Sequence, residues 1–137
     1  MERIEREKFR QGFLRAMDGG CAAVPGLLLQ CYREMGLGDT DVMLYIHLLY
    51  FSEWERKEFP TLDEICDRMS ASREEVVAAL ERLIGEGFVE IEDAVDVSTG
   101  VRTERYRCRN MLEKLAEHLA ARERKREEEE SVRAHRR

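Results

Sequence analysis

The stretch TLDEICDRMSASREEVVAALERLIGEGFVEIEDAVDVSTGVRTERYRC, residues 61–108, contains the pattern that decides the fold. Thr61 and Ser72 are each followed three residues later by a glutamate, which is the signature of a capping box at the start of a helix. Only Ser70 and Ala71 separate Met69 from the second cap. We therefore expect two short helices that meet at a sharp corner.

The second half of this stretch changes from helical to strand periodicity. An apolar stripe marks the second helix, and Gly87 is the expected left-handed residue just beyond its end. Apolar and charged residues then alternate over 89–92 and again over 104–108, on either side of a polar turn at 96–100. The order helix, corner, helix and hairpin predicts a mainly α protein with a small β-hairpin wing, a winged helix-turn-helix.

The rest of the chain divides around this centre. Residues 42–51 are apolar nearly all round, which predicts a buried first helix of the winged domain. Pro25 suits the first turn of a preceding helix, and Asn110 can cap a last helix whose apolar stripe stops near Ala121. We predict an N-terminal arm at 1–24, a winged-helix domain at 25–120, and a charged tail at 121–137 that is either a solvated helix or disordered.

A short extended segment lies in the arm, where Pro25 disfavours helical geometry for the residue before it. No neighbouring sequence provides a hairpin partner for this segment. An unpaired strand edge needs a partner, and a second copy of the chain is the simplest one. We therefore predict self-association through Cys21, Ala22, Ala23 and Val24.

Composition excludes several classes of protein. Hydrophobic residues make up 43% of the 137 residues and charged residues 38%, and no apolar run approaches the ~18 residues that a membrane span needs. The charged N-terminus does not resemble a signal peptide, so we expect a cytoplasmic protein. Four dispersed cysteines and three dispersed histidines show no metal-ligand spacing, and no catalytic constellation is present. We expect no cofactor, no metal and no enzymatic activity.

The charge distribution bears on whether such a domain reads DNA. The net charge is −6, and the expected reading helix carries four glutamates against two arginines, the wrong sign for binding phosphates. A transcription regulator that binds duplex DNA nevertheless remains the alternative. Its phosphate and base contacts would come from the arginines of the second helix and the second wing strand: Arg73, Arg82, Arg102, Arg105 and Arg107.

Several short motifs together resemble the N-terminal domain of the DnaD-like replication-initiation proteins of low-GC Gram-positive bacteria. They are VPGLLLQCYREMGL at 24–37, FPT at 59–61, MSASREE at 69–75, LIGEGF at 83–88 and ERY at 104–106. Each motif is weak by itself, but their order and spacing over about a hundred residues are similar to those of that family.

The resemblance implies a scaffold for primosome assembly that binds the replication initiator and the helicase-loading proteins. It also implies dimers or tetramers formed through an added N-terminal helix–strand–helix segment, and an initiator-binding face near the wing and the arm. Mapped onto this chain, that face would include Phe13, Ile91 and Glu104. Core packing is the competing interpretation for Phe13 and Ile91, and an ordinary cross-strand partnership with an arginine is the competing one for Glu104. We expect this sequence to lack the family's second domain, as either a fragment or a naturally short relative would, and we therefore expect its DNA binding to be weak or indirect.

Overall fold

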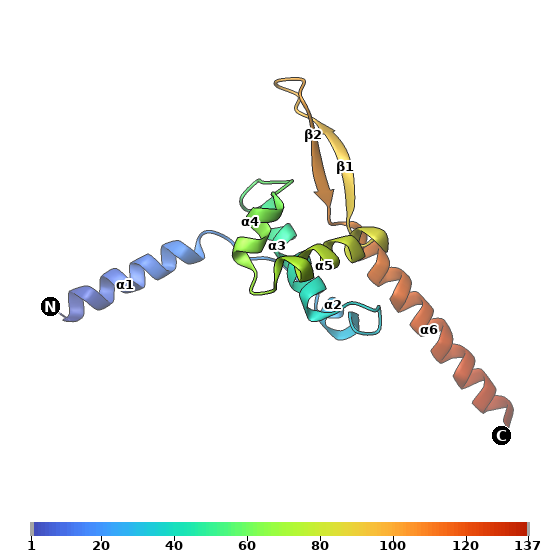
Figure 1. Ribbon diagram of the computed structural model, residues 1–137. Coiled ribbons are helices and arrows are strands. Elements are labelled where there is room, and N and C mark those ends of the chain that lie inside the picture. Colours follow the sequence, from blue (N-terminus) through green and yellow to red (C-terminus); the bar gives the residue numbers. More distant parts are fainter. Residues whose placement is uncertain (1, 137) are drawn as a thin grey trace.

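Six helices and one two-stranded sheet make up the computed structural model, which describes residues 2–136 (Figure 1). In chain order they are α1 (Glu2–Met17), α2 (Gly26–Cys31), α3 (Asp39–Glu53), α4 (Leu62–Arg68), α5 (Arg73–Gly85), β1 (Glu90–Val95), β2 (Arg102–Arg107) and α6 (Asn110–Arg136). The protein is thus mainly helical with a small antiparallel hairpin, as the sequence pattern predicted. No helix within residues 2–136 combines the length and the apolar character that crossing a bilayer requires.

Helix α3 lies at the centre of the core. Its apolar side chains point to several sides of the helix, so α2, α4, α5 and the start of α6 can all pack around it. The buried core residues of α3 are Val42, Leu44, Tyr45, Leu48 and Phe51, and the other elements contribute Leu28, Cys31, Leu37, Ile65, Val76, Ala79, Leu83, Phe88, Val89, Cys108, Met111 and Leu115. The nearly uniform apolar composition of 42–51 therefore reflects burial on most faces.

The corner between α4 and α5 is built from the predicted caps. Thr61 Oγ1 accepts the backbone N–H of Glu64 at 3.2 Å, and the Glu64 carboxylate accepts the N–H of Thr61 at 3.2 Å. Ser72 caps α5 by accepting the N–H of Glu75 at 3.1 Å. The reciprocal bond from the Glu75 side chain, which a complete second capping box would need, is not formed within residues 2–136.

Two glycines in the left-handed region follow helices α2 and α5. Gly36 and Gly87 have φ angles of +82° and +79°, the left-handed region that side chains with a Cβ rarely adopt. After Gly87, Phe88 N–H donates to Leu83 C=O at 2.9 Å, the bonding pattern of a Schellman motif. The helix expected to begin at Pro25 ends already at Cys31, because residues 32–36 form turns that lead into Gly36.

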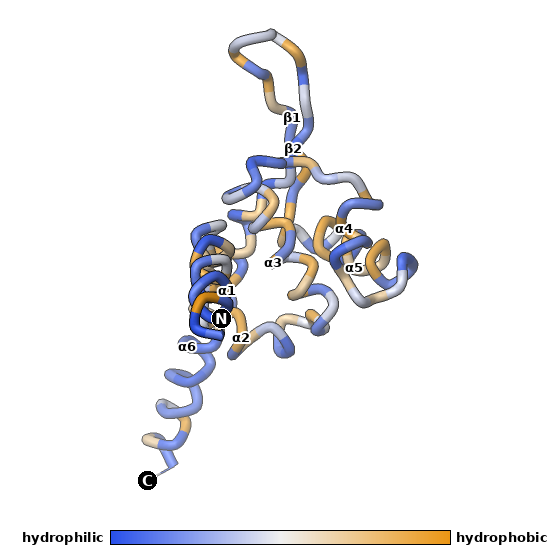
Figure 2. The backbone as a smooth tube through the Cα atoms, turned by 90° about the vertical axis from the view of Figure 1, so that its left-hand side faces the viewer, coloured by the Kyte–Doolittle hydropathy of each residue, from blue (hydrophilic) through white to orange (hydrophobic). Residues whose placement is uncertain are grey.

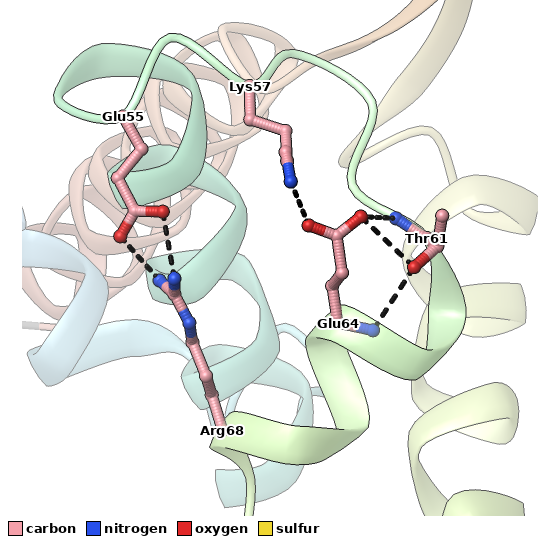
Figure 3. A network of polar contacts seen from close by, with 5 residues as sticks. All are labelled: Glu55, Lys57, Thr61, Glu64 and Arg68. Carbon is pink, nitrogen blue, oxygen red and sulfur yellow. Dashed lines mark hydrogen bonds and ion pairs between the residues drawn. The ribbon is translucent and has the colours of Figure 1, made fainter.

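The loop from Trp54 to Thr61 is tied to α4 and supports the hairpin. Figure 3 shows Arg68 donating two hydrogen bonds to the Glu55 carboxylate, at 2.7 and 2.8 Å, and Lys57 paired with Glu64. The Arg68 guanidinium also lies 4.1 Å from the centre of the Phe51 ring. This network fixes the loop against the end of α3.

The same loop contacts strand β2. The backbone N–H of Tyr106 donates to Glu58 C=O at 3.0 Å, and the rings of Phe59 and Tyr106 stack with centroids 4.6 Å apart. Phe59 therefore packs on the hairpin. The orientation of the hairpin relative to the helices therefore depends on this loop.

Two helices extend beyond the core (Figures 1 and 2). Helix α1 projects from one side and contains no buried residue, and the second half of α6 extends as a largely hydrophilic rod. The segment 121–136, for which a solvated helix or disorder was expected, continues α6 with every side chain exposed. No strand is assigned between α1 and α2 within the described residues. A strand is defined by pairing, so the predicted pairing of 21–24 with a second copy stays a prediction.

Candidate functional site

The root of the N-terminal arm is anchored on the end of α3. Tyr50 donates its hydroxyl hydrogen to Gly19 C=O at 3.1 Å, and the Trp54 indole N–H donates to Cys21 C=O at 2.8 Å. Gly20 between them has φ +103°, and a Cβ there would lie 2.0 Å from Trp54 Cδ2. The tryptophan ring therefore packs directly on the glycine backbone, and no other residue type fits at this position without displacing it.

The segment after this anchor has the features expected of a strand that lacks a partner. Side chains alternate, with Cys21 and Ala23 exposed and Ala22 and Val24 half-buried, and Val24 packs against the core. Within residues 2–136, the backbone groups of residues 22–24 make no hydrogen bond to another part of the backbone. Of the predicted self-association residues, Ala22, Ala23 and Val24 thus have backbone N–H and C=O groups that are not paired with other backbone groups, whereas the Cys21 C=O is bonded to Trp54.

Helix α1 displays apolar side chains that the chain itself leaves uncovered. Phe9 is 78% exposed, Phe13 57% and Met17 51%, and their spacing of four residues places them along one side of the helix. Core packing, the competing interpretation for Phe13, is therefore wrong for the single chain. Exposed aromatic residues on a projecting helix are typical of a surface that another protein covers.

One face of the hairpin carries both predicted wing residues. Directly opposed residues of an antiparallel pair share a face, so the pairs Ile91–Tyr106 and Asp93–Glu104 lie side by side. Ile91 is 42% exposed, so it does not belong to the core. Glu104 is opposed by an acid and makes no ion pair with an arginine within residues 2–136, so the cross-strand interpretation is wrong for it.

This hairpin face is apolar at its base and acidic above. Burial raises the pKa of Tyr106, and the negative charge of Glu104 raises it further. Ile91, Tyr106 and the Asp93–Glu104 pair form a compact half-apolar surface. Such a face suits a partner that brings an apolar side chain and a cation.

Most arginines of the DNA-binding alternative are already paired with acids. Arg105 pairs with Glu92, and Arg107 lies 3.9 Å from Glu90, on the opposite face of the hairpin. On α5, Arg73 contacts Asp63 at 2.5 Å and Arg82 contacts Asp41 at 2.6 Å. The fifth, Arg102, is opposed by Val95 across the hairpin. The five arginines do not form one cationic face with acids turned away.

The predicted initiator-binding residues occupy two separate places in the single chain. Ile91 and Glu104 share one hairpin face, whereas Phe13 lies on α1, which projects from a different side of the core (Figure 1). A single partner could reach all three only if it is extended, or if a second copy brings its own arm beside the hairpin.

One cluster of side chains escaped the sequence analysis. Cys31, Glu34 and His118 bring a thiol, a carboxylate and an imidazole together, with ligand atoms within 4.8 Å of one another. No spacing along the sequence indicated this cluster, because Glu34 and His118 are 84 positions apart. Only the spacing of three between Cys31 and Glu34 gave a local signal, and such spacing is common on helices.

Comparison with known proteins places this architecture in a family. Residues 24–127 match the family described as the DnaD N-terminal domain, a range that runs from the arm segment into α6. The chain belongs to the DnaD N-terminal domain family. The resemblance drawn from the short sequence motifs is thereby confirmed.

Two relatives of known identity align with most of the chain. It is 31% identical over 110 residues to the replicative helicase loading/DNA remodeling protein DnaD of Bacillus subtilis (strain 168), an alignment that covers 80% of this chain and 47% of that protein. The chain thus matches about half the length of that relative. The crystal structure of the N-terminal domain of DnaD protein from Geobacillus kaustophilus HTA426 is similar with a TM-score of 0.68 at 29% identity, covering 86% of this chain and 96% of that one.

Proposed function

We propose that this chain is a non-catalytic scaffold for DNA replication initiation that self-associates through its N-terminal arm and binds the initiator and helicase-loading proteins. Family membership and the name of the Bacillus subtilis relative, a helicase-loading protein, support the replication role. The exposed apolar side of α1 and the half-apolar hairpin face support a role in binding proteins. Within this proposal the protein acts in the cytoplasm, with DNA contact weak or indirect.

The finer fold assignment belongs to the same proposal. Helices α3, α4 and α5 followed by the hairpin match the order of a winged helix-turn-helix, with α5 in the position of the reading helix and β1–β2 as the wing. In a DNA-binding winged helix, α5 would carry cations towards the groove. Here its exposed surface is acidic, which fits a winged helix used for protein contacts.

The observation that carries the self-association proposal is the unpaired backbone of residues 22–24. If two copies pair there, each chain supplies N–H groups to the other, and proline, which has no N–H, would interrupt the pairing. Ala22→Pro and Ala23→Pro are made as two separate variants. The N–H groups of neighbouring strand residues point to opposite edges, so only one of the two N–H groups faces the partner strand. Ala23→Ser is the matched control, since it keeps the N–H and the exposure.

Light scattering of the full chain measures the outcome. We expect a dimer or a tetramer for the parent chain and for Ala23→Ser, and a smaller species for at least one proline variant with unchanged helical circular dichroism. A monomeric parent chain, or proline variants that keep the mass of the parent, would refute self-association through this segment.

Initiator binding is tested at the two predicted surfaces. Phe13→Ala, Ile91→Ala and Glu104→Gln should each weaken binding of the purified initiator protein by tenfold or more, the effect of losing about 1.4 kcal/mol. Val97→Ala at the hairpin turn, where Val97 is 99% exposed, is the control. Equal affinities for all four variants would exclude this surface.

A transcription regulator is the second candidate, favoured only by the proposed fold. It predicts tight binding to duplex DNA at low salt and a steep loss of affinity as salt is raised. With four of its five arginines in ion pairs, we expect duplex affinity in the non-specific range. Nanomolar binding to one sequence would favour the regulator over the scaffold.

A further inference from the structure

A cluster of three potential metal ligands lies where the end of α2 meets α6. Cys31 ends α2, Glu34 lies in the turn that follows, and His118 projects from α6. The His118 Nε2 and Glu34 Oε2 atoms are 2.9 Å apart, and the Cys31 sulfur lies within 4.8 Å of both ligand atoms. The three donor atoms therefore surround one point between two elements that are distant in sequence.

Burial is graded across the cluster. Cys31 is fully buried, the His118 side chain is 26% exposed, and the Glu34 side chain is 54% exposed. The thiol thus lies on the buried side of the cluster, and the side formed by His118 and Glu34 is open to water. The positively charged Arg122 guanidinium already lies close to the thiol, because its Nη1 donates to the Cys31 sulfur at 3.5 Å.

We propose that this cluster is a zinc-type site, in which a divalent cation is held by the Cys31 thiolate, the His118 imidazole and the Glu34 carboxylate, with water as the fourth ligand. Sulfur, nitrogen and carboxylate oxygen are the donors of tetrahedral zinc sites. On binding, the Cys31 thiol releases its proton to solvent, while neutral His118 and ionised Glu34 donate lone pairs. This site is independent of the replication role.

The adjustments that the ion requires are small. Metal–ligand bonds of about 2.1 Å at tetrahedral angles place nitrogen and oxygen ligands about 3.4 Å apart. The contact between His118 and Glu34 must therefore open slightly from 2.9 Å, and the sulfur must approach them. The Arg122 guanidinium must move away from the sulfur, which its exposed position on α6 allows.

A bound ion would join two parts of the fold that otherwise share few contacts. The ligands connect the α2 segment, which follows the arm, to α6, which continues into the charged rod. Because the ion binds the folded chain and not the separated ligands, it would stabilise the attachment of α6 to α2. We expect the site to be structural.

Titration with Co²⁺ tests the proposal, because cobalt bound to a thiolate has a charge-transfer absorption band that cobalt bound only to nitrogen and oxygen lacks. The full chain is used with Cys21→Ser, since the exposed Cys21 thiol is a competing ligand. We expect one equivalent of Co²⁺ per chain, a thiolate band, and displacement by Zn²⁺. Cys66→Ser, outside the cluster, should leave the titration unchanged.

Variants of the ligands decide the outcome. His118→Gln and Glu34→Gln, both at exposed or half-exposed positions, should weaken Co²⁺ binding tenfold or more, and Cys31→Ala should abolish the thiolate band. Arg122→Gln, which removes the competing cation, should strengthen binding. The proposal is overturned if the parent chain shows no thiolate band, or if the band survives His118→Gln and Glu34→Gln with unchanged affinity. Those two variants keep the test valid even if Cys31→Ala fails to fold.

Discussion

The ion pair between Asp41 and Arg82 is unequal in burial, and this asymmetry gives a quantitative prediction. Asp41 is 1% exposed, and its carboxylate accepts hydrogen bonds from the Gly38 N–H at 2.7 Å and from Arg82 at 2.6 Å. The Arg82 side chain is 44% exposed. Removing Arg82 therefore leaves a buried anion at Asp41, whereas removing Asp41 leaves a hydrated cation at Arg82.

We expect Arg82→Ala to cost about 3 kcal/mol in the free energy of unfolding, because it leaves a buried carboxylate without its counter-ion. Asp41→Asn should cost about 1 kcal/mol, since the amide oxygen can still accept the Gly38 N–H and water can solvate Arg82. The double variant should be more stable than Arg82→Ala alone, because the amide carries no charge that needs a partner.

Urea unfolding of the full chain at pH 7 and one fixed protein concentration measures these differences. Arg73→Ala is the matched control: its partner Asp63 is 78% exposed, so the free energy of unfolding should stay nearly unchanged. An Arg82→Ala variant as stable as Asp41→Asn, or a double variant less stable than Arg82→Ala, would refute the reasoning. The same result bears on DNA binding, because an arginine committed to a buried acid is not free to contact phosphate.

Three further predictions concern the arm, the α4 cap and acid stability. Gly20→Ala places a methyl group against the Trp54 ring, 2.0 Å from the nearest carbon; we expect loss of self-association by light scattering with the helical signal retained, and an unchanged mass would contradict the role of this anchor. Thr61→Ala should cost about 1 kcal/mol in urea unfolding by removing the cap of α4, whereas Thr61→Ser should restore most of it. The pKa of Glu55 is lowered chiefly by its hydrogen bonds from Arg68, and that of Glu64 chiefly by its hydrogen bond from Lys57. Lowered folded-state pKa values mean that these carboxylates stabilise the fold above about pH 4.3 and that this stability is lost as the pH falls below it. The melting temperature should therefore drop less steeply between pH 5 and pH 3 in a Glu55→Gln/Glu64→Gln variant, and an identical slope would exclude the network as the cause.

The local features of the fold could be predicted because each depends on neighbouring residues. The caps at Thr61 and Ser72 and the left-handed Gly87 are set by hydrogen bonds and sterics within a few residues. The buried α3 followed from a nearly continuous apolar run. Element ends were less predictable, since α2 stops at Cys31 where the chain turns towards Gly36, and α6 continues well past its apolar stripe.

Features formed by distant parts of the chain could not be predicted. Nothing near Gly20 indicates that Trp54 packs on it, and nothing near Glu104 indicates that Asp93 will oppose it, because register depends on the turn and on the loop that supports β2. The ion pairs that neutralise most of the arginines of the DNA-binding alternative also involve partners from other elements.

The sequence by itself determined the helix starts, the corner, the hairpin and the family, because capping, turn geometry and periodicity are properties of short segments. Only the tertiary structure decided which side chains face solvent and which charges are paired. It also brought Cys31, Glu34 and His118 together, since packing of α2 against α6 joins residues that the chain separates. Surfaces and sites of this kind depend on contacts across the fold, and a linear pattern does not encode them locally.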